Sequence, residues 1–244
     1  MKLATRTLGT GSRTAALVHG ASMGSDVWRD FAEILVDHYD MSVILIDQRG
    51  HGDSPRAESY QVTDFVADLV ENLPTGLDFL MGQSLGGVSS AWAAKDLQPR
   101  RYIGLDPAFT AGTVTALALR FLGRMQTKLP DRILKAIGMP PEGAAPDMLE
   151  RVHAMWSKWD SSMMSQLVSS GRRTPFPIGP PAVPTTLVLA DPSLFVKPPM
   201  AKALSALGWD IRIKPKGEHD LHVQDPAGVI KMLDDVLREN APQG

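Results

Sequence analysis

Unbroken apolar runs alternate with amphipathic stretches along most of the chain. The runs are short, which is typical of strands buried on both faces of a sheet. Strands are predicted at residues 15–18, 43–46, 77–81, 102–105 and 186–190, with a more exposed one at 210–214. Amphipathic or alanine-rich stretches predict helices at residues 26–37 (with Ser25 as N-cap), 62–73, 88–97, 201–207 and 226–238. This alternation indicates an α/β fold, with a mostly parallel central sheet and helices on both faces.

One segment, residues 111–183, interrupts the alternation and has no strand pattern. It ends in a proline-rich connector and holds helical pieces at residues 114–125, 129–137 and 147–168. We interpret it as a helical cap, or lid, inserted between two strands and packed over one edge of the sheet. The core domain is then built from residues 1–110 and 184–244.

The composition limits the class of protein. With 244 residues, the chain is long enough for one sizeable core. Its net charge of −2 favours neither nucleic acid nor a membrane surface as partner, so we expect a small-molecule substrate and a monomer or homodimer. The lack of cysteine excludes disulfides, thiolate catalysis and cysteine-based metal sites. No apolar run approaches the ~20 residues of a membrane span and the N-terminus lacks a secretory pattern, so a cytoplasmic location is expected.

The pentapeptide at residues 82–86, Gly-Gln-Ser-Leu-Gly, carries the strongest chemical signal. It matches G-x-S-x-G and lies between a predicted strand and a predicted helix, where such a serine sits on a sharp, strained turn. Glycine on either side lets the two backbones pass closely. The positive end of the helix would face the negative charge that develops during acyl transfer. Ser84 is therefore the candidate nucleophile.

A serine nucleophile needs a histidine to accept its proton and a carboxylate to orient that histidine. In a parallel sheet these groups are expected just beyond the carboxyl ends of strands. Two acids follow predicted strands, Asp106 and Asp191, and two histidines lie late in the chain, His219 and His222. Their order after Ser84 is the serine, acid, histidine order expected for a serine on a strand–turn–helix.

Five motifs together resemble the α/β-hydrolase superfamily over nearly the full chain. They are His19-Gly20, the loop 47–54 (Asp-Gln-Arg-Gly-His-Gly-Asp-Ser), the pentapeptide 82–86 with the following Gly87, Asp191-Pro192 and Gly217-Glu218-His219. The resemblance implies the α/β-hydrolase fold with a helical cap. It favours Asp191 over Asp106 as the triad acid, and His219 over His222 as the base.

The resemblance also implies an oxyanion hole, formed by the backbone N–H groups of Ala21 and Leu85. Trp156 and Trp159 are three residues apart on the predicted helix 147–168, and so share one face. They either pack the cap onto the core or line the substrate pocket, for which Ser22 is a further candidate. If the tryptophans line the pocket, the bound acyl or alcohol group is apolar.

These residues predict a serine hydrolase, an esterase that cleaves a small, apolar ester or lactone through an acyl-enzyme. No cofactor or metal is expected, because the phosphate-loop, dinucleotide-binding and H-E-x-x-H motifs are absent. In the superfamily the same triad also serves C–C bond hydrolysis, cofactor-free peroxidation, amide cleavage and cyanohydrin cleavage, and some members are receptors with slow or no turnover. Dehalogenase and epoxide hydrolase chemistry is disfavoured, since those relatives carry aspartate where this chain has Ser84.

Overall fold

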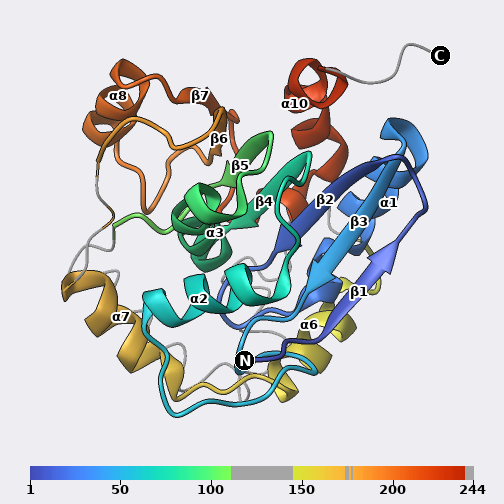
Figure 1. The fold of residues 1–244 in the computed structure, drawn as a ribbon, viewed down its shortest axis with the longest axis vertical. Helices are drawn as coiled ribbons and strands as arrows, with labels where there is room; N and C mark the ends of the chain where they lie inside the picture. The colour runs from blue at the N-terminus through green and yellow to red at the C-terminus, as the bar shows by residue number, and fades with distance from the viewer. Residues whose placement is uncertain (111–144, 174–175, 177, 240–244) are drawn as a thin grey trace.

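A computed structural model of the protein describes residues 1–110, 145–173, 176 and 178–239. The predicted helices at 114–125 and 129–137 lie outside the described residues. A seven-stranded sheet crosses the described part in the order β1-β3-β2-β4-β5-β6-β7. Neighbouring strands are parallel except β1 and β3 (Figure 1). The strands are β1 (Thr5–Leu8), β2 (Arg13–Val18), β3 (Met41–Ile46), β4 (Phe79–Gln83), β5 (Arg101–Leu105), β6 (Thr185–Leu189) and β7 (Asp210–Ile213).

The sheet confirms the predicted α/β class. Every residue of β4 and β6 is buried, as their unbroken apolar runs indicated. The strand that the sequence analysis missed is β1, which lies at the edge of the sheet and pairs with β3. Three of its four residues are exposed, so it carries no apolar run that could reveal it.

Helices cover both faces of the sheet. α1 (Arg29–Tyr39) and α10 (Pro226–Arg238) pack on one face, and α2 (Val62–Asn72), α3 (Ser84–Leu97) and α8 (Pro198–Ala206) on the other (Figure 1). Successive side chains of β2 point to opposite faces: Leu17 packs with α1 and α10, whereas Val18 packs with α2 and α3. Within the described residues, no helix has the length and apolar character that a membrane crossing requires.

Three helices begin differently from the prediction, one of them α8, which begins at Pro198 instead of residue 201. A 3-10 turn, η1 (Ser25–Trp28), precedes α1, and its N-cap is Gly24 with no side-chain cap hydrogen bond. The prediction of Ser25 as N-cap is therefore wrong. α3 begins at Ser84 itself, four residues before the predicted start at 88, because the chain passes from β4 into the helix without a loop.

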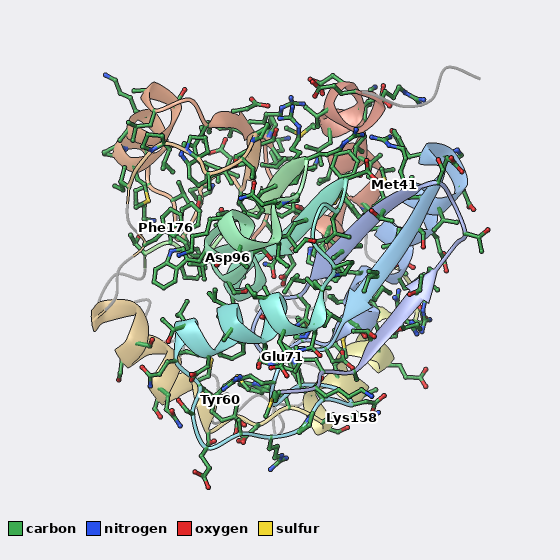
Figure 2. The ribbon with its side chains drawn as sticks, viewed as in Figure 1. Met41, Tyr60, Glu71, Asp96, Lys158 and Phe176 are labelled. Atoms are coloured by element: carbon green, nitrogen blue, oxygen red, sulfur yellow. The ribbon has the colours of Figure 1, made fainter. Side chains whose placement is uncertain are left out.

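Residues 145–173 form two helices where the sequence analysis predicted one, α6 (Met148–Ser157) and α7 (Met163–Arg173). The turn between them is held by the core. The Tyr60 hydroxyl donates to the Asp160 carboxylate at 2.8 Å, and Lys158 forms an ion pair with Asp53 at 2.7 Å. Figure 2 shows Tyr60 and Lys158 at the end of the molecule where α6 and α7 lie. These contacts explain why the helix is interrupted.

His222 lies on the short helix α9 (Leu221–Gln224) and belongs to the core. Its ring packs on the indole of Trp28, with 4.0 Å between the ring centroids. Neither ring nitrogen has a hydrogen-bond partner among the described residues. Burial, reinforced by the charges of His219 and His19, lowers the pKa of His222 to about 3. His222 is therefore a neutral packing residue at neutral pH.

We expect Gly86→Ala to destabilise the protein, because α3 passes β2 closely at this glycine. A Cβ on Gly86 would lie 2.2 Å from the carbonyl oxygen of Val18. Such overpacking costs about 1–3 kcal/mol of unfolding free energy, measurable by urea denaturation. Gly179→Ala is the matched control, since its Cβ would meet no atom within 4 Å. Equal midpoints for Gly86→Ala and the wild type would contradict the close approach.

His222 also predicts how stability depends on pH. The unfolded chain protonates this histidine below about pH 6.5, whereas the folded chain does so only near pH 3. Its contribution is thus fully present above about pH 6.5 and is lost as the pH falls towards 3. His222→Leu should lose less unfolding free energy than the wild type between about pH 7 and pH 5. An identical loss in His222→Leu and in the wild type would refute the assignment.

Candidate active site

Ser84 occupies the turn between β4 and α3, at the carboxyl edge of the sheet. Its φ of 51° lies in the left-handed region, which residues other than glycine rarely adopt. Glycine makes the turn possible, because a Cβ on Gly82 would lie 2.3 Å from the carbonyl oxygen of Gly86. The strand–turn–helix setting predicted for Ser84 is therefore present, and the serine is 9% exposed.

Asp106, directly after β5, pairs with His219. Its Oδ2 lies 2.7 Å from Nδ1 of the imidazole, and the carboxyl group is fully buried. Its other oxygen accepts a longer hydrogen bond from the amide of Ala190, at 3.4 Å. A carboxylate only accepts hydrogen bonds, so the ring proton is on Nδ1 and Nε2 is left as the basic nitrogen.

The prediction that Asp191 is the partner of His219 is wrong. Asp191 is exposed, and its backbone amide donates to the carbonyl oxygen of Gly217 at 3.1 Å. Both acids follow a strand near the site: Asp106 follows β5, next to β4, and Asp191 follows β6, next to the β7 strand that precedes His219. The order of the strands therefore excludes neither acid. The side chains differ in where they lie, because the Asp106 carboxylate is fully buried against the imidazole whereas Asp191 is exposed.

The surroundings of His219 stabilise its protonated form. Burial alone would lower its pKa, but the hydrogen bond to Asp106 and the charges of Asp220 and Asp106 together outweigh burial and raise the pKa. The ring of Phe195 packs against the imidazole, with 4.9 Å between centroids. His219 is thus a base whose proton affinity is increased by carboxylates.

The loop after β2 lies against the Ser84 turn. A Cβ on Gly20 would be 3.2 Å from the Cβ of Ser84, so Ala21, the first predicted oxyanion donor, follows the point of contact. Leu85, the second, lies in the first turn of α3, where an N–H group has no intrahelical partner. Both N–H groups are therefore close to the serine in the chain or in space, and their role as an oxyanion hole stays a prediction.

Two buried histidines hold this loop. Nε2 of His19 accepts a hydrogen bond from the amide of Gln48 at 3.0 Å, and Nε2 of His51 accepts one from the amide of Ser22 at 3.1 Å. Burial lowers the pKa of both histidines, which keeps the two acceptor nitrogens unprotonated. Both side chains therefore support the loops by hydrogen bonds to backbone amides.

The two tryptophans do not share a helix face, so that prediction is wrong. α6 ends at Ser157, and Trp159 follows it in the turn. Trp156 is buried in the same apolar cluster as Trp28, on the α1 side of the sheet. Trp159 belongs to the cluster on the α2 side, and its Nε1 lies 3.2 Å from the sulfur of Met163. Their place in a substrate pocket, like that of Ser22, stays a prediction.

Two neighbours of His219 were not singled out from the sequence. Phe195 lies in the loop after β6 and no motif marks it. Gln83 lies inside the pentapeptide, directly before Ser84, and its side-chain amide donates to the backbone carbonyl of His219 at 3.1 Å. Its polar character within a buried strand is the signal that could have revealed it. Within the described residues, no three His, Asp or Glu side chains gather as a metal site requires.

Comparison with known proteins gives partial sequence matches and full-length structural ones. Over 80 residues the chain is 36% identical to 2-(acetamidomethylene)succinate hydrolase of Mesorhizobium japonicum, a match that covers 31% of this chain and 28% of that protein. An esterase from Thermogutta terrifontis superposes with a TM-score of 0.75 at 21% identity, covering 98% of this chain and 94% of that one. An enol-lactonase from Burkholderia xenovorans superposes with a TM-score of 0.73 at 17% identity, covering 96% of both.

The structural matches establish the fold, and a family model extends the match to the sequence. The model of the alpha/beta hydrolase family matches residues 16–232, from within β2 to within α10. This range includes Ser84, Asp106 and His219. The chain therefore belongs to the alpha/beta hydrolase family.

Proposed function

We propose that this protein is a serine hydrolase that cleaves a small ester or lactone. Ser84 is the nucleophile, His219 the general base and acid, and Asp106 the group that orients and stabilises His219. The observation that carries the proposal is the 2.7 Å contact between Asp106 and Nδ1 of His219, made beside a strained serine turn. Membership of the alpha/beta hydrolase family supports the proposed hydrolase activity.

Each group has a defined role in the proposed reaction. Nε2 of His219 takes the proton of the Ser84 hydroxyl while Oγ adds to the carbonyl carbon. The oxygen of the tetrahedral intermediate is held by the N–H groups of Leu85 and Ala21. His219 then donates its proton to the departing alcohol oxygen, which leaves an acyl-enzyme. Water, deprotonated by His219, then adds to the acyl carbon. When the second tetrahedral intermediate collapses, His219 returns this proton to Oγ of Ser84, and the acid and free Ser84 are released.

Asp106 contributes because the imidazole gains a positive charge when it accepts the serine proton. A fully buried carboxylate at hydrogen-bond distance favours that charge far more than one in water would. It also keeps the ring proton on Nδ1, so Nε2 stays available as the base. A carboxylate that stabilises the imidazolium raises the pKa of the histidine, and the pKa of His219 is raised.

The bond type and the apolar character of the substrate are supported by two observations. The structural neighbours named above are an esterase and an enol-lactonase, two classes that attack an ester carbonyl. Phe195, buried against His219, gives the base an apolar neighbour, which suits an apolar acyl or alcohol group. Residues 111–183 are proposed as the cap that selects this group.

A fluorophosphonate probe should label the wild type and leave Ser84→Ala unlabelled, because the probe reacts with an activated serine hydroxyl. Labelling is read by intact-protein mass spectrometry. Ser90→Ala is the control: it removes a buried hydroxyl on the same helix that has no partner among the described residues, and it should label like the wild type. Labelling of Ser84→Ala to the same extent as wild type would refute Ser84 as nucleophile.

Asp106→Asn should lower kcat for a p-nitrophenyl ester by roughly 10³–10⁴-fold, since the amide no longer favours the charged imidazole or its tautomer. Asp191→Asn removes the same charge from an exposed position and should keep most of the activity. Circular dichroism of both variants checks the fold. If Asp191→Asn loses the larger share of kcat, Asp191 and not Asp106 is the acid that serves His219.

A further inference from the structure

Gln83 contacts both loops that flank the proposed nucleophile. Its side chain is buried, and Nε2 lies 3.1 Å from the backbone carbonyl oxygen of His219 and 3.2 Å from Oδ1 of Asp220. The amide oxygen at the same end lies against the loop after β2, because a Cβ on Gly20 would be 2.2 Å from Oε1. One side chain therefore joins the loop that carries the base to the loop beside the serine.

Asp220 brings a second carboxylate to the base. It follows His219 directly, precedes α9, and is half-buried. Asp220 and His219 are consecutive residues, and both accept a hydrogen bond from the side-chain amide of Gln83. On balance the pKa of Asp220 is raised, because burial and the charge of Asp106 outweigh the opposing charge of His219. The hydrogen bond from Gln83 partly offsets the burial of its carboxylate.

We propose that Gln83 is a positioning residue and that Asp220 is a second carboxylate serving His219. Gln83 fixes the backbone that carries the imidazole and directs Asp220 toward it. Asp220 then shares with Asp106 the stabilisation of the imidazolium that forms when the serine proton is transferred. The proposal rests on the proposed function in naming His219 as the base, but its electrostatic part is measurable without turnover.

The groups around His219 come from several elements. Asp106 lies at the end of β5, Asp220 follows His219 in the loop, His222 lies on α9, and Phe195 covers the ring. His222 is neutral at the pH values of interest, because its pKa is about 3. Asp106 and Asp220 are therefore the two carboxylates whose charges raise the pKa of His219. Glu218, on the other side of His219 in the sequence, is exposed.

The electrostatic part is tested by NMR titration of the ¹⁵N-labelled imidazole rings. In Asp220→Asn the amide oxygen still accepts from Gln83 while the charge is lost, so the titration midpoint of His219 should move to lower pH. His219→Gln assigns the signal. Glu218→Gln removes the same charge one residue before His219 and should give a smaller shift. Equal shifts in the two variants, or no shift in Asp220→Asn, would overturn the role of Asp220.

The positioning part is tested with Gln83→Met, which keeps the length of the side chain and removes its amide. We expect kcat for the p-nitrophenyl ester to fall about 10- to 100-fold with little change in KM. The acid limb of kcat/KM against pH should also move to lower pH, because Asp220 is no longer directed at the base. An unchanged kcat, or a loss of kcat with the wild-type pH profile, would overturn the role of Gln83.

The experiments distinguish a failure of the proposed hydrolase function from a failure of the roles proposed for Gln83 and Asp220. If the wild type does not react with the fluorophosphonate probe, the proposed hydrolase is wrong, yet the NMR comparison still reports whether Asp220 acts on His219. If the probe reacts and Asp220→Asn leaves the His219 midpoint in place, the hydrolase stands and the second carboxylate is refuted. Should Gln83→Met fail to fold, Gln83→Leu repeats the kinetic test of Gln83, and the NMR comparison of Asp220→Asn with Glu218→Gln still decides the role of Asp220.

Discussion

The turn at Ser84 places a severe steric constraint on the strands and the helix around it. A left-handed φ at a residue with a side chain costs about 1–2 kcal/mol, and it persists only where the surrounding structure fixes it. Here β4 is bonded to β2 on one side and β5 on the other, and α3 leaves without a loop. The chain segments then approach so closely that Gly82 and Gly86 have no room for a Cβ. The hydrogen bonds of β4 to β2 and β5 therefore hold Ser84 in its strained conformation.

Backbone strain gathers where the loops converge. Ser22, Ser84 and Asp106 all have positive φ values, and each lies just beyond the end of a parallel strand. Asp40 and Gln98 have positive φ as well, but they close α1 and α3, where this conformation is common. The strain at strand ends is of another kind. At Asp106 it accompanies the short contact between the carboxylate and the imidazole of His219.

Local patterns predicted most of the fold because burial of a strand leaves a continuous apolar run. They missed β1, whose exposure removes that signal, and they joined α6 to α7, because the interruption depends on Tyr60 and Asp53 far away in the chain. Ser84 and His219 were identified from motifs. The choice of Asp191 over Asp106 was wrong because both acids follow strands, and no local pattern reveals which carboxylate is buried against the histidine and which is exposed.

The ties between residues 145–173 and the core have a consequence for protein engineering. Each joins one side chain of this segment to one on the core: Arg151 with Asp30 at 2.7 Å, Lys158 with Asp53 at 2.7 Å, and Asp160 with Tyr60 at 2.8 Å. The segment is therefore not a portable module. A chimaera that takes it from a relative would leave the core partners facing foreign side chains. A buried Arg151 moved elsewhere would keep Asp147 of its own segment but lose Asp30. Transplants should carry both halves of each pair.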